Sequence, residues 1–290
     1  MKRTKKEMKP DAILTGDWHL RETVPRARTD NYWNAQWKKI AFITNLQIKY
    51  QCPIIQSGDV FDHWKPSPYL LSTSIVNMPG NVNCIYGNHD LPQNNLQQSG
   101  KSGLSTLLLS NAVKIFPGTH WGQKEQYTSE IKEATIHVWH IMTWKGERPW
   151  PGCEDPSTQD ILKEAKADLT VTGHNHKTFT DRLDGKLLVN PGSLMRSSAD
   201  QIDHKPCVFL WSAKTNTVKK VFLPIEENVI SREHLTSVKE RDTRIEAFIN
   251  KLKMGYETEV SYTKNLETFF SSNKIPSKVE KIVWECLEAI

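Results

Sequence analysis

The chain has 290 residues, of which 38% are apolar and 9% aromatic, so it can bury a sizeable core and is not expected to be disordered. Its net charge of +5 is compatible with a polyanionic substrate. However, five of the first nine residues are Lys or Arg, so a solvated basic tail over residues 1–10 accounts for much of this charge equally well. No run of about 18 apolar residues occurs, which excludes a membrane-spanning helix.

The cysteines and the N-terminus indicate a compartment. Five cysteines occur without a Cys-X-X-Cys pair, and their odd number argues against a disulfide framework. Free thiols suit a reducing environment. The basic N-terminus is not followed by the apolar stretch of a secretory signal. We therefore expect a cytoplasmic protein that does not associate with a membrane.

Strands and helices alternate in the first third of the chain. Short apolar runs that end near a glycine predict strands at 12–15, 53–55 and 82–86. Helical spacing of apolar residues predicts helices at 33–50 and 67–77. This alternation is typical of an α/β sheet in which ligands gather beyond the strand ends.

The middle of the chain continues this pattern and then becomes rich in strands. We predict a short helix at 104–110, strands at 113–116 and 134–142, a helix at 157–167, a strand at 168–172 and several short strands between 177 and 223.

Two amphipathic helices are predicted near the C-terminus. One has an apolar face from Leu235 to Leu252, and the other, which starts near Pro276, has an apolar face from Val279 to Ile290. The sequence thus predicts a basic tail at 1–10, an α/β catalytic domain at 11–227 and a helical extension at 228–290.

Five motifs place metal-ligand side chains directly after a predicted strand or at its end. They are Gly16-Asp17-Trp18-His19, Gly58-Asp59, Gly87-Asn88-His89-Asp90, His140 and Gly173-His174-Asn175-His176. Side chains two residues apart on extended backbone point the same way, so the Asp and His of the first motif can grip one ion. Each motif alone is more often a turn or a core residue, but five in series predict a two-metal site for phosphate esters. The mixture of imidazole, carboxylate and amide suits manganese, iron or zinc better than calcium.

The order of these motifs resembles that of the calcineurin-like metallophosphoesterases, over residues 11–225. The resemblance implies a four-layer αββα sandwich and two divalent cations, which we expect to be manganese, with iron or zinc as alternatives. It implies that the first ion binds Asp17, His19, Asp59 and His176, and that the second binds Asp59, Asn88, His140 and His174. It further implies that His89 protonates the leaving oxygen or stabilises the phosphoryl group and that Asp90 orients the His89 ring.

The fourth ligand of the second ion is the least constrained assignment. His137 and His140 lie on one predicted strand, and their odd spacing places them on opposite faces. We prefer His140 because it stands at the carboxyl end of the strand, and we keep His137 as the alternative.

Two segments resemble the SbcD-type DNA-repair nucleases of this superfamily. They are Asp17-Trp18-His19-Leu20 and the stretch from Gly58 to Pro68. Residues 62–68 would form a loop at the mouth of the site, where His63, Trp64 and Lys65 could contact the backbone or a base of DNA; a rim loop packed by the tryptophan is the alternative.

Another segment points to small stand-alone phosphodiesterases of the same superfamily, because Asn190-Pro191-Gly192-Ser193 resembles their turn. Arg196 follows this turn and is a candidate phosphate contact, although an arginine that faces solvent is the commoner outcome.

We predict a DNA exonuclease or endonuclease of the SbcD type. A hydrolase of small phosphodiesters or phosphomonoesters is the first alternative, and a DNA-repair scaffold with a vestigial metal site is the second. The resemblance also implies that the C-terminal helices dock on an SMC-like ATPase of the SbcC type. Such helices can equally form a homodimer or fold back on the catalytic domain.

Overall fold

In the computed structural model, the chain is described over residues 9–233, 262–273 and 275–288. It divides into two compact units, residues 1–232 and 233–290. Most of the predicted basic tail and the apolar face predicted from Leu235 to Leu252 lie outside the described residues. The second unit contains helices α6 (Tyr262–Ser272) and α7 (Ser277–Glu288). Among the described residues, no helix is long and apolar enough to span a bilayer.

A six-stranded sheet forms one half of the first unit, in the strand order β11-β10-β1-β2-β3-β4. Its parallel strands are β1 (Ala12–Thr15), β2 (Ile54–Gln56), β3 (Val82–Cys84) and β4 (Lys114–Ile115). The antiparallel strands β10 (Cys207–Ser212) and β11 (Thr217–Phe222) complete it, and β10 pairs with β1. Strands β1 and β2 are buried on both faces, which is typical of a parallel sheet covered on both sides.

A five-stranded sheet forms the other half, in the order β5-β6-β7-β9-β8. Its strands are β5 (Thr128–Ile131), β6 (Ala134–His140), β7 (Leu169–Gly173), β8 (Phe179–Leu183) and β9 (Lys186–Asn190). Strands β6, β7 and β9 are mutually parallel, whereas β5 and β8 run antiparallel at the edges.

Helices join the strands, and their first residues carry recognisable capping signals. They are α1 (Tyr32–Tyr50), α2 (Pro68–Asn77), α3 (Gly103–Leu109) and α4 (Thr158–Glu164), with short 3-10 turns η1 (Pro92–Asn94), η2 (Leu96–Lys101), η3 (Ala199–Gln201) and η4 (Ala213–Thr215). Ser67 caps α2 just before a proline at its first position, and Ser157 forms a capping box with Asp160 at the start of α4.

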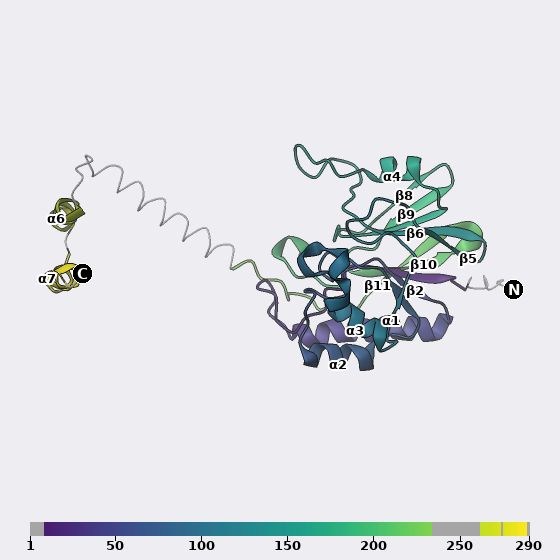
Figure 1. The fold of residues 1–290 in the computed structure, drawn as a ribbon, viewed down its shortest axis with the longest axis horizontal. Coiled ribbons are helices and arrows are strands. Elements are labelled where there is room, and N and C mark those ends of the chain that lie inside the picture. Colours follow the sequence, from purple (N-terminus) through teal and green to yellow (C-terminus); the bar gives the residue numbers. More distant parts are fainter. Residues whose placement is uncertain (1–8, 234–261, 274, 289–290) are drawn as a thin grey trace. The chain divides into compact units, whose positions relative to one another are not determined.

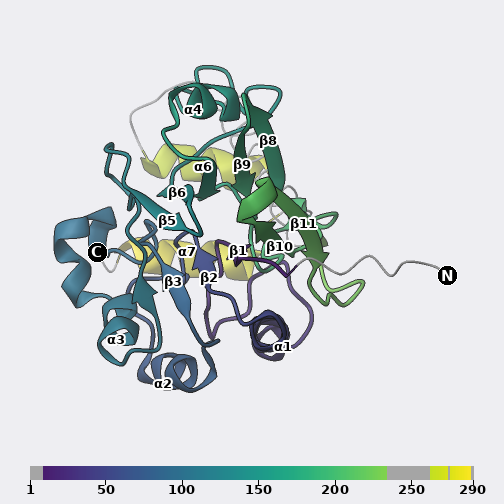
Figure 2. The same cartoon turned by 90° about the vertical axis from the view of Figure 1, so that its right-hand side faces the viewer.

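Alternation along β1 separates the two main cores. Ile13 packs with α1–α3 on one face of the six-stranded sheet, whereas Ala12 and Leu14 pack between the sheets. On the outer face of the five-stranded sheet, Leu188 packs with residues of α4. Figure 2 shows the resulting layers, with α1–α3 on one side, the two sheets in the middle and α4 on the other side. The expected four-layer αββα sandwich is therefore confirmed.

Candidate metal centre

The candidate ligands stand where strands of both sheets end. Asp17 follows β1, Asp59 follows β2 and Asn88 follows β3, whereas His140 ends β6 and His174 follows β7. Figure 1 shows β6, β8 and β9 between α4 and the strands β2, β10 and β11 of the other sheet. Strands β1, β2 and β3 are parallel to one another, as are β6 and β7. Their carboxyl ends therefore bring residues from widely separated parts of the sequence to one edge of the sandwich.

The backbone at four of these positions is left-handed. The φ angles are 46° at Asp17, 45° at His19, 57° at Asp59 and 78° at His174. Such conformations cost roughly 1–3 kcal/mol each in residues other than glycine and persist where the surroundings enforce them. Here Asp17 N donates to Gly58 O at 3.2 Å and His19 N donates to Asp59 O at 3.0 Å, so each loop holds the other in place.

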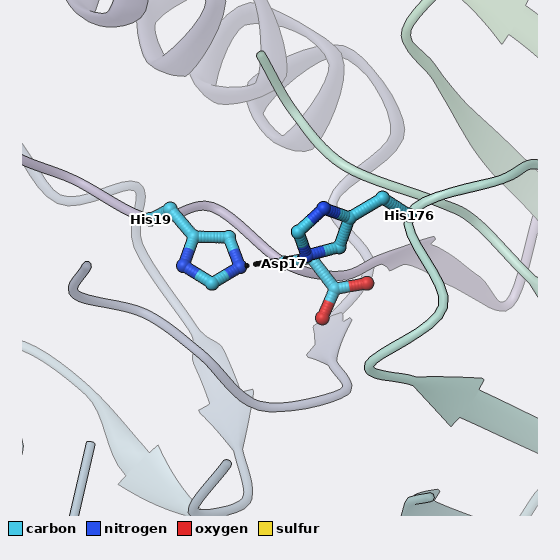
Figure 3. Close-up of side chains that lie close together, drawn as sticks. All are labelled: Asp17, His19 and His176. Atoms are coloured by element: carbon cyan, nitrogen blue, oxygen red, sulfur yellow. Dashed lines mark hydrogen bonds between the residues drawn. The ribbon is translucent and has the colours of Figure 1, made fainter. Parts of the chain in front are cut away.

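The first group of donor atoms comprises Asp17, His19 and His176. Figure 3 shows the two imidazoles and the carboxylate turned toward one another, with Nε2 of His19 3.0 Å from Nε2 of His176. One ligand atom from each of the three residues lies within 4.8 Å of the others. Donor atoms about 2.1 Å from a shared ion lie roughly 3.0–3.5 Å apart, so this spacing fits one cation.

The second group comprises Asp59, Asn88, His140 and His174. Oδ1 of Asn88 lies 2.9 Å from Nδ1 of His174 and 3.1 Å from Nε2 of His140. Nδ1 of His140 lies 2.7 Å from the carbonyl oxygen of Ser57, to which it donates a hydrogen bond. This hydrogen bond fixes the ring and directs Nε2 into the site, as is usual for a metal-ligating histidine.

Asp59 joins the two groups. Its Oδ2 lies 3.5 Å from Nε2 of His19 and 3.4 Å from Nε2 of His140, so one oxygen is almost equidistant from both sets of donors. Its Oδ1 accepts a hydrogen bond of 2.9 Å from the backbone N–H of His89. The carboxylate is thus held in the position of a bridge between two cations.

Burial and mutual charge shift the pKa values of these groups. Burial raises the pKa of Asp17 to about 6 and lowers the pKa values of His19 to about 3 and His174 to about 4. Burial also opposes the charged forms of Asp59 and His140, but the attraction between these two groups outweighs burial. This attraction holds the pKa of Asp59 well below its usual range and raises the pKa of His140 to about 9. Neutral His19 and His174 are in the protonation state that binds metals.

Two buried carboxylate oxygens without hydrogen-bond partners indicate that the residues fit a pair of cations. Oδ2 of Asp17 and Oδ2 of Asp59 are buried and have no hydrogen-bond partner within the part of the chain that the structure describes. Leaving a buried carboxylate oxygen unpaired is costly unless a cation compensates it. Together with four imidazoles and an amide oxygen, these atoms fit two divalent cations. The site therefore has the composition of a two-metal hydrolase centre.

The expected contact between Asp90 and the ring of His89 is not formed, and this expectation is corrected. The carboxylate of Asp90 instead accepts hydrogen bonds from the backbone N–H groups of Val60 at 3.2 Å, Phe61 at 3.1 Å and Gly87 at 3.1 Å. The carboxylate therefore holds the loops together through three backbone amides. Burial, and then the charge of Asp59, raises the pKa of Asp90 to about 7.

Asp62, which the sequence assigned only to the mouth loop, orients the ring of His89. Nδ1 of His89 lies 2.7 Å from the carbonyl oxygen of Asp62, and the carboxylate of Asp62 lies 3.7 Å from Nδ1 of His19 and 2.9 Å from the guanidinium of Arg21. The side chains of His19, Asp62 and His89 form a third group with metal-ligand spacing. The signal that could have found Asp62 is its place three residues after the bridging Asp59.

Trp121 is a second residue that the sequence did not indicate. Its ring centroid lies 4.8 Å from that of His174 and 5.9 Å from that of His140, so it covers one side of the second group. Trp121 stands in a loop without periodicity, and no spacing signal marks it. By contrast, His137 lies outside both groups, with Nε2 2.9 Å from Oγ1 of Thr119.

The mouth loop lies beside the site, as the contacts of its first residue, Asp62, with His19 and His89 show. His63 and Lys65 are exposed, and Trp64 is half-buried, with its ring centroid 5.4 Å from that of His63. Both the predicted contact with DNA and the alternative of packing by Trp64 are compatible with this arrangement.

Arg196 is placed differently from the expectation. Its guanidinium is buried and donates to the carbonyl oxygens of Ile202 at 3.2 Å and Glu226 at 2.6 Å. Its own carbonyl oxygen accepts a hydrogen bond of 2.9 Å from Arg28. These contacts commit the side chain to bracing the chain around residues 196–226, so the expected role in binding phosphate is corrected.

Comparison with known proteins identifies the family of the domain. The family model for the calcineurin-like phosphoesterase superfamily domain matches the sequence over residues 12–214, which is more than half of the chain. The chain therefore belongs to the calcineurin-like phosphoesterase superfamily. No curated protein matches it.

The solved structures that are similar to this chain are distant in sequence. An archaeal phosphodiesterase aligns over 73% of this chain and 99% of its own, with 15% identity and a TM-score of 0.43. Vps29 from Entamoeba histolytica, in complex with Zn²⁺, aligns over 73% and 97%, with 16% identity and a TM-score of 0.36. Vacuolar protein sorting 29 from Cryptosporidium parvum aligns over 73% and 95%, with 16% identity and a TM-score of 0.37.

Proposed function

We propose that this phosphoesterase is a binuclear metal-dependent phosphodiesterase that cleaves DNA. The observation that carries the proposal is the position of Asp59, whose buried Oδ2 lies 3.5 Å from Nε2 of His19 and 3.4 Å from Nε2 of His140. A single carboxylate between two sets of imidazoles is the arrangement that two cations require when they act on one phosphate group.

The seven ligand side chains would hold the cations in two sets that share Asp59. The first set is Asp17, His19, Asp59 and His176, and the second is Asp59, Asn88, His140 and His174. When bound, divalent cations in such a site act as Lewis acids that compensate negative charge on phosphoryl oxygens. We propose manganese as the native metal because imidazole and carboxylate together suit it better than calcium.

His89 is placed to move a proton at the mouth of this centre. It is exposed, and its ring stands edge-on to that of His19 at a centroid distance of 4.7 Å. Because Nδ1 lies 2.7 Å from the carbonyl oxygen of Asp62, Nδ1 carries a hydrogen and donates it to that oxygen. Nε2 is then the nitrogen that exchanges a proton with the leaving oxygen of the substrate. Asp90 supports this step indirectly, through the backbone of the loops that it holds.

The choice of DNA as substrate rests on the mouth loop and on the resemblance of its motifs to SbcD-type nucleases. An exposed imidazole and an exposed ammonium at His63 and Lys65 flank a half-buried indole at Trp64. Cationic groups neutralise backbone phosphates, and an indole face stacks on bases. A role in DNA repair, recombination or replication, and docking of the C-terminal helices on an SbcC-type ATPase or a second copy, belong to the same proposal.

The test uses purified protein stripped of metal by a chelator and then loaded with Mn²⁺, Mg²⁺ or Ca²⁺. We expect hydrolysis of single-stranded DNA, duplex DNA and bis-p-nitrophenyl phosphate with Mn²⁺, lower rates with Mg²⁺ or Ca²⁺, and none in excess chelator. Hydrolysis that persists after complete removal of metal would disprove the mechanism.

A paired substitution tests the substrate. Trp64→Ala with Lys65→Ala should slow cleavage of DNA much more than hydrolysis of the small diester, which does not reach the loop. Lys214→Ala is the matched charge control, because Lys214 is exposed and follows β10 at the end where Trp211 pairs with Ala12, opposite the metal centre. An equal fall for both substrates would favour a hydrolase of small phosphate esters.

A further inference from the structure

A cavity of about 460 Å³ opens next to the metal centre. It begins at His176, a ligand of the first group, and is bounded on the other side by the end of β11, the edge strand of the six-stranded sheet. Its volume is within the range of sites that bind small molecules or cofactors. None of the residues proposed for the mouth loop lines it, so it is a separate part of the surface around the centre.

The sheet register explains why the cavity lies at the catalytic edge. Phe222 pairs with Cys207, at the end of β10 that lies beside the carboxyl end of β1. Val221 packs on the helical side of the sheet, so the alternation of a strand directs Phe222 and Lys220 to the other side, toward the residues that follow β7. The cavity therefore lies between the end of β11 and the loops that follow β7 and β9, at the same edge as the metal centre.

An aromatic ring and three cations dominate its wall. Phe222 is 57% exposed, an unusual position for a large aromatic side chain, and Nζ of Lys220 lies 5.9 Å from its ring centroid. Lys177, which is next to His176, and Lys205 also line the cavity and are exposed. Two carboxylates, Asp200 and Asp203, offset part of this charge, which leaves a net charge of +1 for these five side chains.

This combination matches the chemistry of a nucleotide. An exposed ring presents a face on which a base stacks, the lysines attract a phosphate, and the carboxylates accept hydrogen bonds from sugar hydroxyl groups or from the amino groups of a base. A purely anionic ligand would not need the ring, and a purely apolar ligand would not tolerate the charges.

We propose that the cavity binds the nucleoside next to the scissile phosphate, with its base stacked on Phe222, while the phosphate lies at the metal centre beside His176. This inference rests on the proposed phosphodiesterase function and deepens it, because it locates the subsite that holds one nucleoside of the substrate. The mouth loop then contacts another part of the same strand.

The test compares two chromogenic diesters that release the same p-nitrophenolate. Thymidine 5′-(p-nitrophenyl) phosphate carries a nucleoside, and methyl p-nitrophenyl phosphate carries only a methyl group. With metal-loaded protein, we expect Phe222→Ala to raise KM for the thymidine ester by about 5- to 100-fold, the range for loss of one stacked base, and to change KM for the methyl ester by less than about twofold. Phe222→Trp should restore tight binding, and Lys214→Ala should behave as the unmodified chain.

Direct binding provides a readout that does not depend on turnover. Titration calorimetry with thymidine 5′-monophosphate should show a similar loss of affinity in Phe222→Ala and a smaller loss in Lys220→Ala. If the methyl ester is hydrolysed but neither KM for the thymidine ester nor nucleotide binding changes in Phe222→Ala, the inference is overturned and the phosphodiesterase function stands. An equal rise of KM for both esters also overturns it. If the unmodified, metal-loaded protein hydrolyses neither ester, the proposed function itself fails.

Discussion

Gly87→Ala tests how closely the bridging carboxylate is fitted to its surroundings. A Cβ atom at position 87 would lie 2.7 Å from Cγ of Asp59 and closer still to its Oδ1 and backbone N, whereas ordinary contact begins at 3.4 Å. The carboxylate, or the loop that carries Asn88 and His89, must therefore move by at least about 0.7 Å. The movement also disturbs the hydrogen bond of 2.9 Å from His89 N to Asp59 Oδ1.

The cost should appear in both stability and rate. Overpacking of this kind costs about 1–3 kcal/mol, which corresponds to a fall in Tm of roughly 2–12 °C for a domain of this size. A displacement near 1 Å at a reacting centre can slow turnover about 10²-fold. Differential scanning calorimetry, metal analysis and hydrolysis of bis-p-nitrophenyl phosphate measure these effects.

Gly100→Ala is the matched control, because a Cβ atom there meets nothing within 4 Å, and it should change stability by less than about 0.5 kcal/mol. If Gly87→Ala kept the Tm, two bound ions and the rate of the unmodified chain, Asp59 would not be the tightly fitted bridge that the distances indicate.

Three further predictions concern the acid, a buried lysine and the C-terminal unit. His89→Ala should retain both ions and lose about 10²–10⁴-fold in rate; empty sites in metal analysis would instead make it a ligand, together with His19 and Asp62. Burial, and then neighbouring arginines, lowers the pKa of Lys39 to about 7. Above that pH the unfolded chain binds more protons than the folded chain, so the folded state gains stability as the pH rises from about 7. Lys39→Met removes this gain, and its stability relative to the unmodified chain, measured by urea unfolding, should fall between pH 6 and 9; a constant difference would contradict the assignment. A chain that ends at residue 232 should fold, bind two ions and cleave a small diester at the normal rate, because all the described residues of the three apolar cores precede that point. An insoluble product would refute this independence.

The clustering of the candidate ligands could be predicted because it depends on short-range features. A buried strand followed by Gly and Asp, as at Gly58-Asp59, carries both its strand signal and its ligand in a few residues. The position of His140 at the end of β6 follows from strand direction alone, since parallel strands bring their carboxyl ends together. The fold class followed from the same alternation of strand and helix.

What the sequence missed depends on contacts between distant segments. Strand β5 has only four residues, mostly polar, and exists because it pairs with β6, so no local periodicity announces it. Asp90 was expected to hold an imidazole, but burial against three backbone amides decided its role. Arg196 was expected near phosphate, but its guanidinium donates to two carbonyl oxygens, of residues 202 and 226, instead. In each case the deciding partner lies elsewhere in the chain.

The ligands of the two cation sites come from both sheets, so bound cations should affect the stability of the folded chain as well as its activity. His19 and His176, which share the first site, are 157 residues apart in the sequence, so no ion can be chelated there until most of the domain has left the ribosome. Metal binding then stabilises only the state in which the two sheets are packed together. It adds about 2.7 kcal/mol to the free energy of unfolding for each ion whose free concentration is 100 times its Kd. If the unfolded chain is the form that proteases degrade, a finished molecule should survive longer when metal is plentiful. Starvation for metal would deplete the protein itself as well as its activity.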